Sequence, residues 1–312
     1  MKNATGILRR HPENPILTPA HVENAMAVFN PSPVVYQGKT LLVLSVYKFG
    51  PNIPVGGYIA ESDDGVHFTI RDKPLIDLQN APHPFNLVRD PLIDNRITKI
   101  EDTYYFVTPV DIDRGAPQAL LGCTKDFQTY EPIEIISLAP NRGISLFPEK
   151  IKGKYYRLDR PGAGDMPASI WLASSPDLIH WGCHRPLLHP GYAFWNQVKI
   201  GPTPPIKTSA GWLVITHAVW SWSNSDYHYY IAAMLLDLEN PERVIGKTTS
   251  WLLAPEKEYE LHGTVNDVVF PCGALADFEK DELWLYYGAA DTNVGLATGS
   301  LSAVIEACQK EI

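Results

Sequence analysis

Two arginines near the middle of the chain carry its clearest chemical signal. Residues 141–161 begin as a loop with Arg142, pass through an apolar segment and a Lys-Gly-Lys turn, and end as a second apolar segment at Arg160. If the two segments pair as a hairpin, both guanidiniums lie at neighbouring strand ends. Arginine presents a rigid fork of donors that suits a carboxylate or a phosphate. The two interpretations are therefore an anion site and a pair of surface ion pairs.

A repeated order of short elements indicates how these arginines are positioned. Each repeat has three apolar strands with a short polar turn, and an Asp or Ser bend before a last apolar or aromatic strand. The repeats begin near residues 30, 95, 146, 205 and 268. A spacing of roughly 50–65 residues is typical of a four-stranded propeller blade. The sequence therefore predicts an all-β fold, a five-bladed β-propeller, in preference to a β-sandwich or two unrelated β domains.

The whole chain, residues 1–312, is expected to form this one catalytic domain. Residues 1–28 are expected to be an irregular N-terminal arm, and residues 302–312 a short C-terminal helix. Two loops are unusual, because residues 72–92 hold several prolines and residues 220–230 are rich in Trp and Tyr. Long loops of this kind tend to be functional, so we expect both to shape the acceptor side of a binding site. A subunit contact is the alternative for residues 220–230.

Polar residues that begin the first strands of the blades are expected to meet at one mouth of the central channel, because those strands line the propeller axis. The ends of the second strands reach the same mouth. The residues at these positions are Asn30, Asp94, Arg96, Arg142, Thr203, Asn266 and Asp267 on the first strands, and Tyr47, Lys48, Arg160, His217 and Asp291 on the second.

This set of side chains predicts acid catalysis beside an anion site. Inverting glycoside hydrolases use one carboxylic acid and a second carboxylate that activates water. Here one carboxylate, Asp94, is accompanied by two arginines and a histidine. Cations in place of the second carboxylate activate water poorly but can hold phosphate. Phosphate is already a nucleophile at neutral pH, so it needs placement more than a base.

Several segments match one known family in the same order along the chain. They are Phe29-Asn30-Pro31, Asp94-Asn95-Arg96-Ile97-Thr98-Lys99-Ile100, Leu146-Phe147-Pro148-Glu149-Lys150-Ile151, Arg160-Pro161, Gly211-Trp212 to His217, Leu235-Leu236-Asp237-Leu238, Val268-Val269-Phe270-Pro271-Cys272-Gly273-Ala274 and Tyr286-Tyr287-Gly288-Ala289-Ala290-Asp291-Thr292. On these segments the chain resembles glycoside hydrolase family 130, the inverting β-mannoside phosphorylases and related β-1,2-mannosidases, which are five-bladed propellers. The resemblance covers nearly the whole chain.

The resemblance implies a role for each candidate residue. Asp94 falls at the position of the general acid, whose proton is thought to pass through the 3-hydroxyl of the mannose. The positions that resemble phosphate ligands are Arg142, Arg160, His217 and, in the 227–230 cluster, Tyr229. The positions that resemble mannose ligands are Asn30 and Asp291, and Arg96 and Lys48 are further substrate-binding candidates.

The chain also departs from the family pattern. The family reads Glu-Asp-Pro-Arg around the acid, whereas this chain reads Ile-Asp-Asn-Arg over residues 93–96. Asp90, followed by a proline, is a rival acid, but the Asp-x-Arg spacing favours Asp94. Ser45 stands where the family often has an arginine, which Lys48 could replace, and Ala218 follows His217 in place of glycine. These changes bear on the acceptor and the linkage more than on the reaction class.

The function that the resemblance implies is an inverting phosphorylase. It would cleave a β-linked mannoside, of the manno-oligosaccharide or mannosyl-glucose type, with inorganic phosphate to give α-mannose 1-phosphate. The alternative on the same fold is an inverting β-mannosidase, in which acidic residues occupy the phosphate positions. A third interpretation, an arabinoside or fructoside hydrolase, needs a carboxylate where this chain has Asn30. A fourth is a sugar-binding propeller without catalysis.

Composition narrows the class of protein further. The net charge of −9 argues against a nucleic-acid partner, and no apolar run reaches the length of a bilayer span. The four cysteines and the histidines show no metal-ligand spacing, so we expect no metal and no cofactor besides phosphate as co-substrate. The first residues lack the apolar core of a secretion signal, which predicts a cytoplasmic protein. Assembly into a homo-oligomer is left open.

Overall fold

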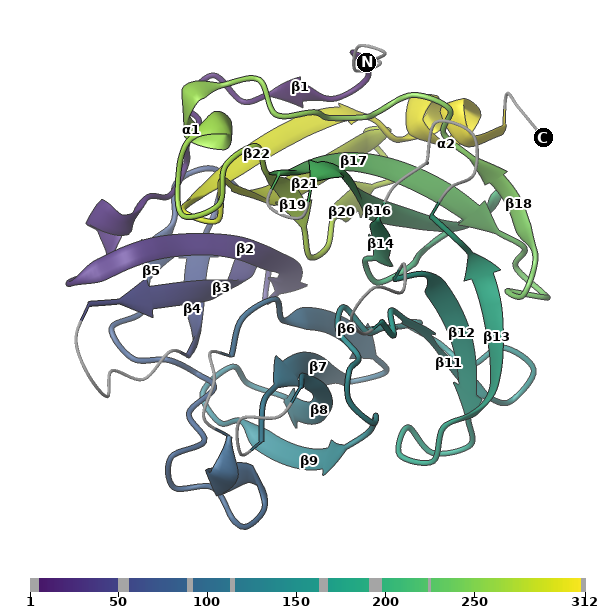
Figure 1. Cartoon of the computed structure of the whole chain (residues 1–312), viewed down its shortest axis with the longest axis horizontal. Coiled ribbons are helices and arrows are strands. Elements are labelled where there is room, and N and C mark those ends of the chain that lie inside the picture. The colour runs from purple at the N-terminus through teal and green to yellow at the C-terminus, as the bar shows by residue number, and fades with distance from the viewer. Residues whose placement is uncertain are drawn as a thin grey trace.

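The computed structural model describes residues 6–49, 56–88, 92–112, 116–162, 168–190, 198–223 and 226–309, without the side chains of residues 222, 223 and 226. Over these ranges five antiparallel sheets are arranged around a common centre (Figure 1). The protein is a five-bladed β-propeller, which confirms the fold predicted from the sequence repeat.

The blades follow one another along the chain. Blade 1 is β2 (Ala25–Tyr36), β3 (Lys39–Lys48), β4 (Gly57–Ser62) and β5 (Thr69–Ile70), and blade 2 is β6 (Arg96–Ile100), β7 (Thr103–Val110), β8 (Gln118–Thr124) and β9 (Glu131–Ile135). Blade 3 is β10 (Ser145–Leu146), β11 (Tyr155–Asp159), β12 (Ile170–Ser175) and β13 (Gly182–Leu188). Blade 4 is β14 (Lys199–Pro202), β15 (Ile206–Thr208), β16 (Gly211–Ser223), β17 (Asp226–Leu236) and β18 (Val244–Lys247). Blade 5 is β19 (Val269–Pro271), β20 (Leu275–Asp277), β21 (Glu282–Ala289), β22 (Asn293–Ser300) and β1 (Arg9–Arg10).

The Asp bend in the sequence repeat has a common structural cause in four blades. Between the third and fourth strands, Oδ1 of Asp64, Asp126, Asp177 or Asp237 accepts two backbone N–H groups two and three residues further on. A carboxylate that replaces backbone acceptors in this way stabilises a tight turn. The chain therefore reverses at the same place in each of these blades.

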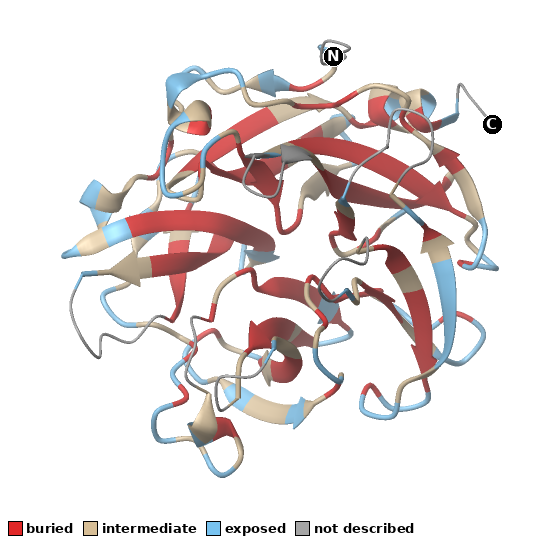
Figure 2. Ribbon diagram, in the orientation of Figure 1, coloured by how far each residue is buried: buried red, intermediate tan, exposed pale blue. Residues whose placement is uncertain are grey.

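Apolar side chains fill the space between neighbouring blades. Successive strand residues point to opposite faces of a sheet, so each blade packs against both of its neighbours. Leu158 and Leu172 of blade 3, for example, join one core with Trp212 of blade 4. Figure 2 shows the resulting pattern, in which the buried residues lie along the inner and middle strands.

The ends of the chain close the ring on blade 5. β1 pairs with β22, so residues from the expected irregular arm supply the outer strand of the last blade. The arm also ends earlier than expected, because β2 begins at Ala25. The C-terminal helix α2 (Leu301–Gln309) buries Leu301 and Cys308 in the core between blades 4 and 5.

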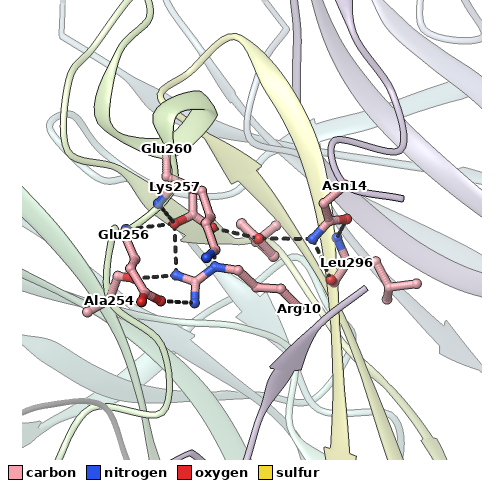
Figure 3. Close-up of polar contacts among 8 residues, drawn as sticks. Arg10, Asn14, Ala254, Glu256, Lys257, Glu260 and Leu296 are labelled. Atoms are coloured by element: carbon pink, nitrogen blue, oxygen red, sulfur yellow. Dashed lines mark hydrogen bonds and ion pairs between the residues drawn. The ribbon is translucent and has the colours of Figure 1, made fainter. Parts of the chain in front are cut away.

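A buried polar cluster fixes the arm to blade 5 (Figure 3). The guanidinium of Arg10 donates to both carboxylate oxygens of Glu260, at 2.7 and 2.8 Å, and Glu260 is fully buried. Glu260 lies in α1 (Glu258–Leu261) and also accepts the hydroxyl of Tyr287 at 2.8 Å. Asn14 donates to that hydroxyl and to the carbonyl of Leu296. Every member of this cluster thus has a partner.

Two boundaries differ from the sequence prediction. The first strand of blade 4 begins at Lys199, not near residue 205, and it is split into β14 and β15 by a proline-rich turn. In the aromatic segment, which was expected to be a loop, residues 220–223 and 226–230 are instead paired strand residues of β16 and β17. In the other unusual segment, Leu78 and Phe85 are buried in the core between blades 1 and 2. Neither described helix is long and apolar enough to cross a membrane.

Candidate active site

Asp94 and its neighbours form the centre of the site, at the start of the first strand of blade 2. The carboxylate is 7% exposed. Its Oδ1 accepts a hydrogen bond from Nδ2 of Asn30 at 2.7 Å, and its Oδ2 lies 3.1 Å from a guanidinium nitrogen of Arg142. Three different blades therefore bring one carboxylate, one amide and one cation together, as the propeller prediction required.

The backbone is bent sharply at three site residues. Asn30, Asp94 and Asp291 have positive φ angles of 47°, 57° and 45°. Asn and Asp adopt this left-handed conformation more readily than other non-glycine residues, which explains the residue types at these bends. At Asn30 the bend coincides with a bulge in the pairing of β2 with β3. Bulges of this kind re-aim side chains.

Two buried residues hold the main chain of Asp94. The hydroxyl of Ser45 accepts the backbone N–H of Asp94 at 3.0 Å, and the guanidinium of Arg96 donates to its carbonyl at 2.5 Å. Arg96 is 1% exposed and stacks over the ring of Phe270. Ser45, which departs from the family pattern, thus fixes the backbone of Asp94 together with Arg96. Asn95, the other departure, bonds to Leu92 and Thr108.

Arg142 and Arg160 lie opposite each other on two antiparallel segments of blade 3, next to a short β-bridge. Asn141 pairs with Pro161, and the N–H of Arg142 donates to the carbonyl of Arg160. The hairpin proposed from residues 141–161 is thus present. The Nε atoms of Arg96, Arg142 and Arg160 are buried and have no hydrogen-bond partner among the described residues. Donors left in this way are costly unless an acceptor reaches them.

Blade 4 adds a fourth cation, Lys199, that the sequence analysis did not identify. Nζ of Lys199 donates to the hydroxyl of Tyr229 at 2.6 Å and lies 4.8 Å from the centre of that ring. His217 lies on the same face of the blade and packs against Phe270, with ring centres 4.5 Å apart. A side chain at Gly201 would collide with the His217 ring and with Arg160, so only glycine fits there.

The surroundings push the pKa values of the two carboxyls apart. Burial alone would raise the pKa of Asp94, but the guanidiniums of Arg142 and Arg96 outweigh it and lower that pKa. Burial, with the charge of Asp94 nearby, raises the pKa of Asp291 to about 7. A site with two carboxyls of opposite shift holds one proton near neutral pH.

The cations also affect one another. Burial and the nearby guanidiniums of Arg160 and Arg142 lower the pKa of Lys199 to about 8. Burial and Arg160 lower the pKa of His217 well below its usual value, so its imidazole is neutral at neutral pH. Both ring nitrogens of His217 are buried without a partner among the described residues. His217 can therefore donate a hydrogen bond to an anion, but it does not add a charge.

One sequence candidate, Lys48, stands apart from this cluster. The ammonium of Lys48 lies over the ring of Tyr58, and no contact among the described residues joins it to Asp94. Asp90, the rival acid, is outside the described residues. The other candidates interact with one another through charge or hydrogen bonds, and so does Lys199; they are Asn30, Asp94, Arg96, Arg142, Arg160, His217, Tyr229 and Asp291. Within the described part of the chain, no three His, Cys, Asp or Glu side chains could hold a metal ion.

Comparison with known proteins agrees with this geometry. A family model described as β-1,4-mannooligosaccharide phosphorylase matches residues 5–310. A 1,2-β-oligomannan phosphorylase of Thermoanaerobacter sp. is 36% identical over 93% of this chain and 96% of its own length. A β-1,4-mannooligosaccharide phosphorylase of Ruminococcus albus is 33% identical over 96% of this chain and 90% of its own length.

A solved structure extends the match to three dimensions. The β-1,2-mannobiose phosphorylase of Listeria innocua, in complex with β-1,2-mannobiose, superposes with a TM-score of 0.84 at 31% identity. The match covers 97% of this chain and 99% of the other. Fold, sequence and the match along the whole chain lead to one conclusion: the chain belongs to glycoside hydrolase family 130, the β-mannoside phosphorylases and related mannosidases.

Proposed function

We propose that this protein is an inverting β-mannoside phosphorylase, which transfers a mannosyl group from a β-linked mannoside to inorganic phosphate. The observation that carries the proposal is the cluster of Arg142, Arg160 and Lys199 around Asp94, with buried donors that lack acceptors within the described residues. A phosphate dianion would satisfy these donors and compensate the charges. Water can accept these hydrogen bonds but does not compensate the charges.

In this reaction the protein has to position phosphate, which is the nucleophile. A phosphate oxygen attacks the anomeric carbon of the mannose from the face opposite the leaving oxygen, and the glycosidic C–O bond breaks. The product is therefore α-mannose 1-phosphate. Arg142, Arg160 and Lys199 bind the phosphate oxygens as cations, while His217 and Tyr229 contribute neutral hydrogen bonds. The bound phosphate anion also stabilises the positive charge that develops on the mannosyl group in the transition state.

Asp94 supplies the proton to the leaving oxygen. It is held from three sides, by Asn30, by Arg142 and through its main chain by Ser45. Asn30 and Asp291 are proposed to orient the mannose next to it. The acid must be protonated to act, yet the ligand-free site keeps it ionised. The anionic co-substrate resolves this conflict, because it offsets the positive charge that lowers the pKa of Asp94.

The experiment is an incubation with β-1,2- and β-1,4-mannobiose in the presence and absence of inorganic phosphate. Proton and phosphorus NMR distinguish α-mannose 1-phosphate from free mannose and report the anomeric configuration. We expect α-mannose 1-phosphate, formed only with phosphate. Free mannose released at equal rates with and without phosphate would make the protein a hydrolase.

Asp94→Asn is the matched catalytic variant. The substitution keeps the size of the side chain. With the new amide turned so that its oxygen faces Asn30, it can still accept the hydrogen bond from Nδ2 of Asn30. We expect turnover to fall by roughly 10²–10⁴-fold. Asp63→Asn, an exposed carboxylate on blade 1, serves as the control. Wild-type turnover in the Asp94 variant would refute its role as the acid.

A further inference from the structure

A groove of about 1260 Å³ lies between blades 2 and 3 and has no part in the chemistry at Asp94. Ile135, the last residue of β9, and residues 136–141 form one wall. The other wall is the face of blade 3 that carries Arg157, Asp159, Trp171 and Trp181. We refer to this space as the blade 2–3 groove. Its volume exceeds that of a typical small-molecule pocket.

The groove exists because the side chains on this face of blade 3 do not close it. Leu158, Ile170 and Leu172 point to blade 4 and belong to a continuous apolar core. By strand alternation, Arg157, Asp159 and Trp171 point the other way, toward blade 2. Among the described residues, the apolar cluster between blades 2 and 3 is the smallest of the five that join neighbouring blades. Packing alone would favour apolar residues at these positions.

The lining suits a neutral, hydroxyl-rich ligand. Arg157 and Asp159 are each 2% exposed and form an ion pair at 3.0 Å, so the floor carries no net charge. Trp171 and Trp181 are half-buried on the walls, and Arg157 stacks on Trp181. Indole rings pack well against the apolar faces of sugars, while the exposed His184 and nearby serines can bond to hydroxyls.

The inner end of the groove adjoins the candidate phosphate site. Asn141 and Pro161 line the groove and are the chain neighbours of Arg142 and Arg160. The side chain of Asn141 donates to Asp159 at 3.3 Å and accepts the N–H of Arg160 at 3.2 Å. A chain that leaves the central mouth over this bridge enters the groove directly.

We propose that the blade 2–3 groove binds the reducing-end sugar units of a β-linked manno-oligosaccharide whose non-reducing end lies at Asp94. The choice of mannose rests on the proposed function, whereas the groove and its preference for a neutral sugar chain do not. The groove then favours long substrates over disaccharides, because the additional sugar units are the ones that occupy it.

The test compares mannobiose with mannohexaose of the same linkage, for the wild type and Trp171→Ala. We expect kcat/KM for mannohexaose to fall roughly fivefold or more in the variant, as for the loss of one aromatic contact, with the value for mannobiose unchanged. Trp171→Phe, which keeps a ring, should restore most of the loss. Phe278→Ala removes an exposed aromatic side chain on blade 5 and should leave kcat/KM unchanged for both substrates.

Calorimetric titration of the two sugars in phosphate-free buffer separates this proposal from the phosphorylase assignment. Tighter binding of mannohexaose than of mannobiose, lost in Trp171→Ala, supports the groove even if no phosphorolysis occurs. Equal binding of both sugars by the wild type overturns the groove proposal. A fall in kcat/KM that is the same for both sugars in Trp171→Ala overturns it as well.

Discussion

A guanidinium nitrogen of Arg142 lies 3.1 Å from a carboxylate oxygen of Asp94, so the proposed acid and a proposed phosphate ligand share one ion pair in the free protein. The pair stabilises the ionised form of Asp94 and thus opposes its role as an acid. We therefore expect proton transfer and phosphate binding to be coupled through Arg142. An anion bound to the guanidinium of Arg142 weakens the attraction between this guanidinium and the ionised carboxylate of Asp94.

The first prediction concerns this coupling. Binding of phosphate should raise the pKa of Asp94, because added negative charge disfavours the carboxylate. Carbon NMR of protein labelled at the Asp carboxyl carbon measures the pKa directly, and Asp94→Asn identifies the signal. Sulfate, which stays a dianion across the neutral range, should raise the pKa of Asp94 as phosphate does. This control excludes titration of the ligand as the cause of the shift. A pKa of Asp94 that is unchanged or lower with either anion would contradict the coupling.

The second prediction concerns Asp291, whose pKa is raised to about 7 by burial and by the charge of Asp94. The pKa of an Asp in the unfolded chain is about 3.9. Between this pKa and the pKa of folded Asp291, the folded protein therefore holds a proton that the unfolded chain has lost. Stability should therefore fall as pH rises from about 4 to about 7 and level off above. Asp291→Asn should be more stable than the wild type at pH 8, by about 2–4 kcal/mol, and show little difference at acid pH.

Chemical denaturation at several pH values measures this difference. Asp267→Asn, at a half-buried carboxylate near the same mouth, is the control. An Asp291→Asn protein that is less stable than the wild type at pH 8 would show that the carboxylate is favourably paired, not penalised by burial.

The third prediction concerns Arg160. Burial, together with the positive charges of Arg142 and Arg96, lowers its pKa to about 10, so the free protein carries mutually repelling cations. Arg160→Met should leave the ligand-free protein as stable as the wild type or more so, while KM for phosphate rises roughly 10- to 100-fold. Arg185→Met, at an exposed arginine of β13, should leave both quantities unchanged.

Thermal unfolding with and without phosphate reports the same change. A ligand that binds only the folded state raises the melting temperature, and this rise should disappear in Arg160→Met. A variant that keeps the full phosphate-dependent rise would exclude Arg160 as a ligand of phosphate.

The sequence predicted the fold because the blade repeat rests on local chemistry. The Asp bends are formed by hydrogen bonds two or three residues away, so their pattern is readable in the chain itself. Asp94, Arg142 and Arg160 follow from the repeat, since each stands at a strand end next to the axis. The resemblance to a family added roles to these positions.

Lys199 was missed for a physical reason. The first strand of blade 4 is interrupted by Pro202, Pro204 and Pro205, which lack the N–H that a strand ladder uses. The sequence analysis therefore began this blade after the prolines, whereas β14 precedes them. The signal that could have found Lys199 is a lysine followed by Ile200 and Gly201 immediately before the break. The hairpin end at Trp220 had a comparable signal, because Trp and Ser alternate there with the period of a strand.

The pairing of Arg10 with Glu260 could not be predicted from local patterns, because 250 residues separate the two in the chain. Their interaction nevertheless closes the propeller and yields the last prediction. Arg10→Met should destabilise the protein by about 3–5 kcal/mol, because it leaves a fully buried carboxylate without its cation. In Arg10→Met/Glu260→Gln the charge is absent, and a large part of that loss should be recovered. The amide oxygen can still accept the backbone N–H groups of Glu256 and Lys257, while the amide NH2 group can donate to the hydroxyl of Tyr287. Arg9→Met, at the exposed neighbour on β1, is the control and should change the melting temperature little. Thermal unfolding of the four proteins measures these effects, and a double variant less stable than Arg10→Met would show that the lost charge is not the main cost.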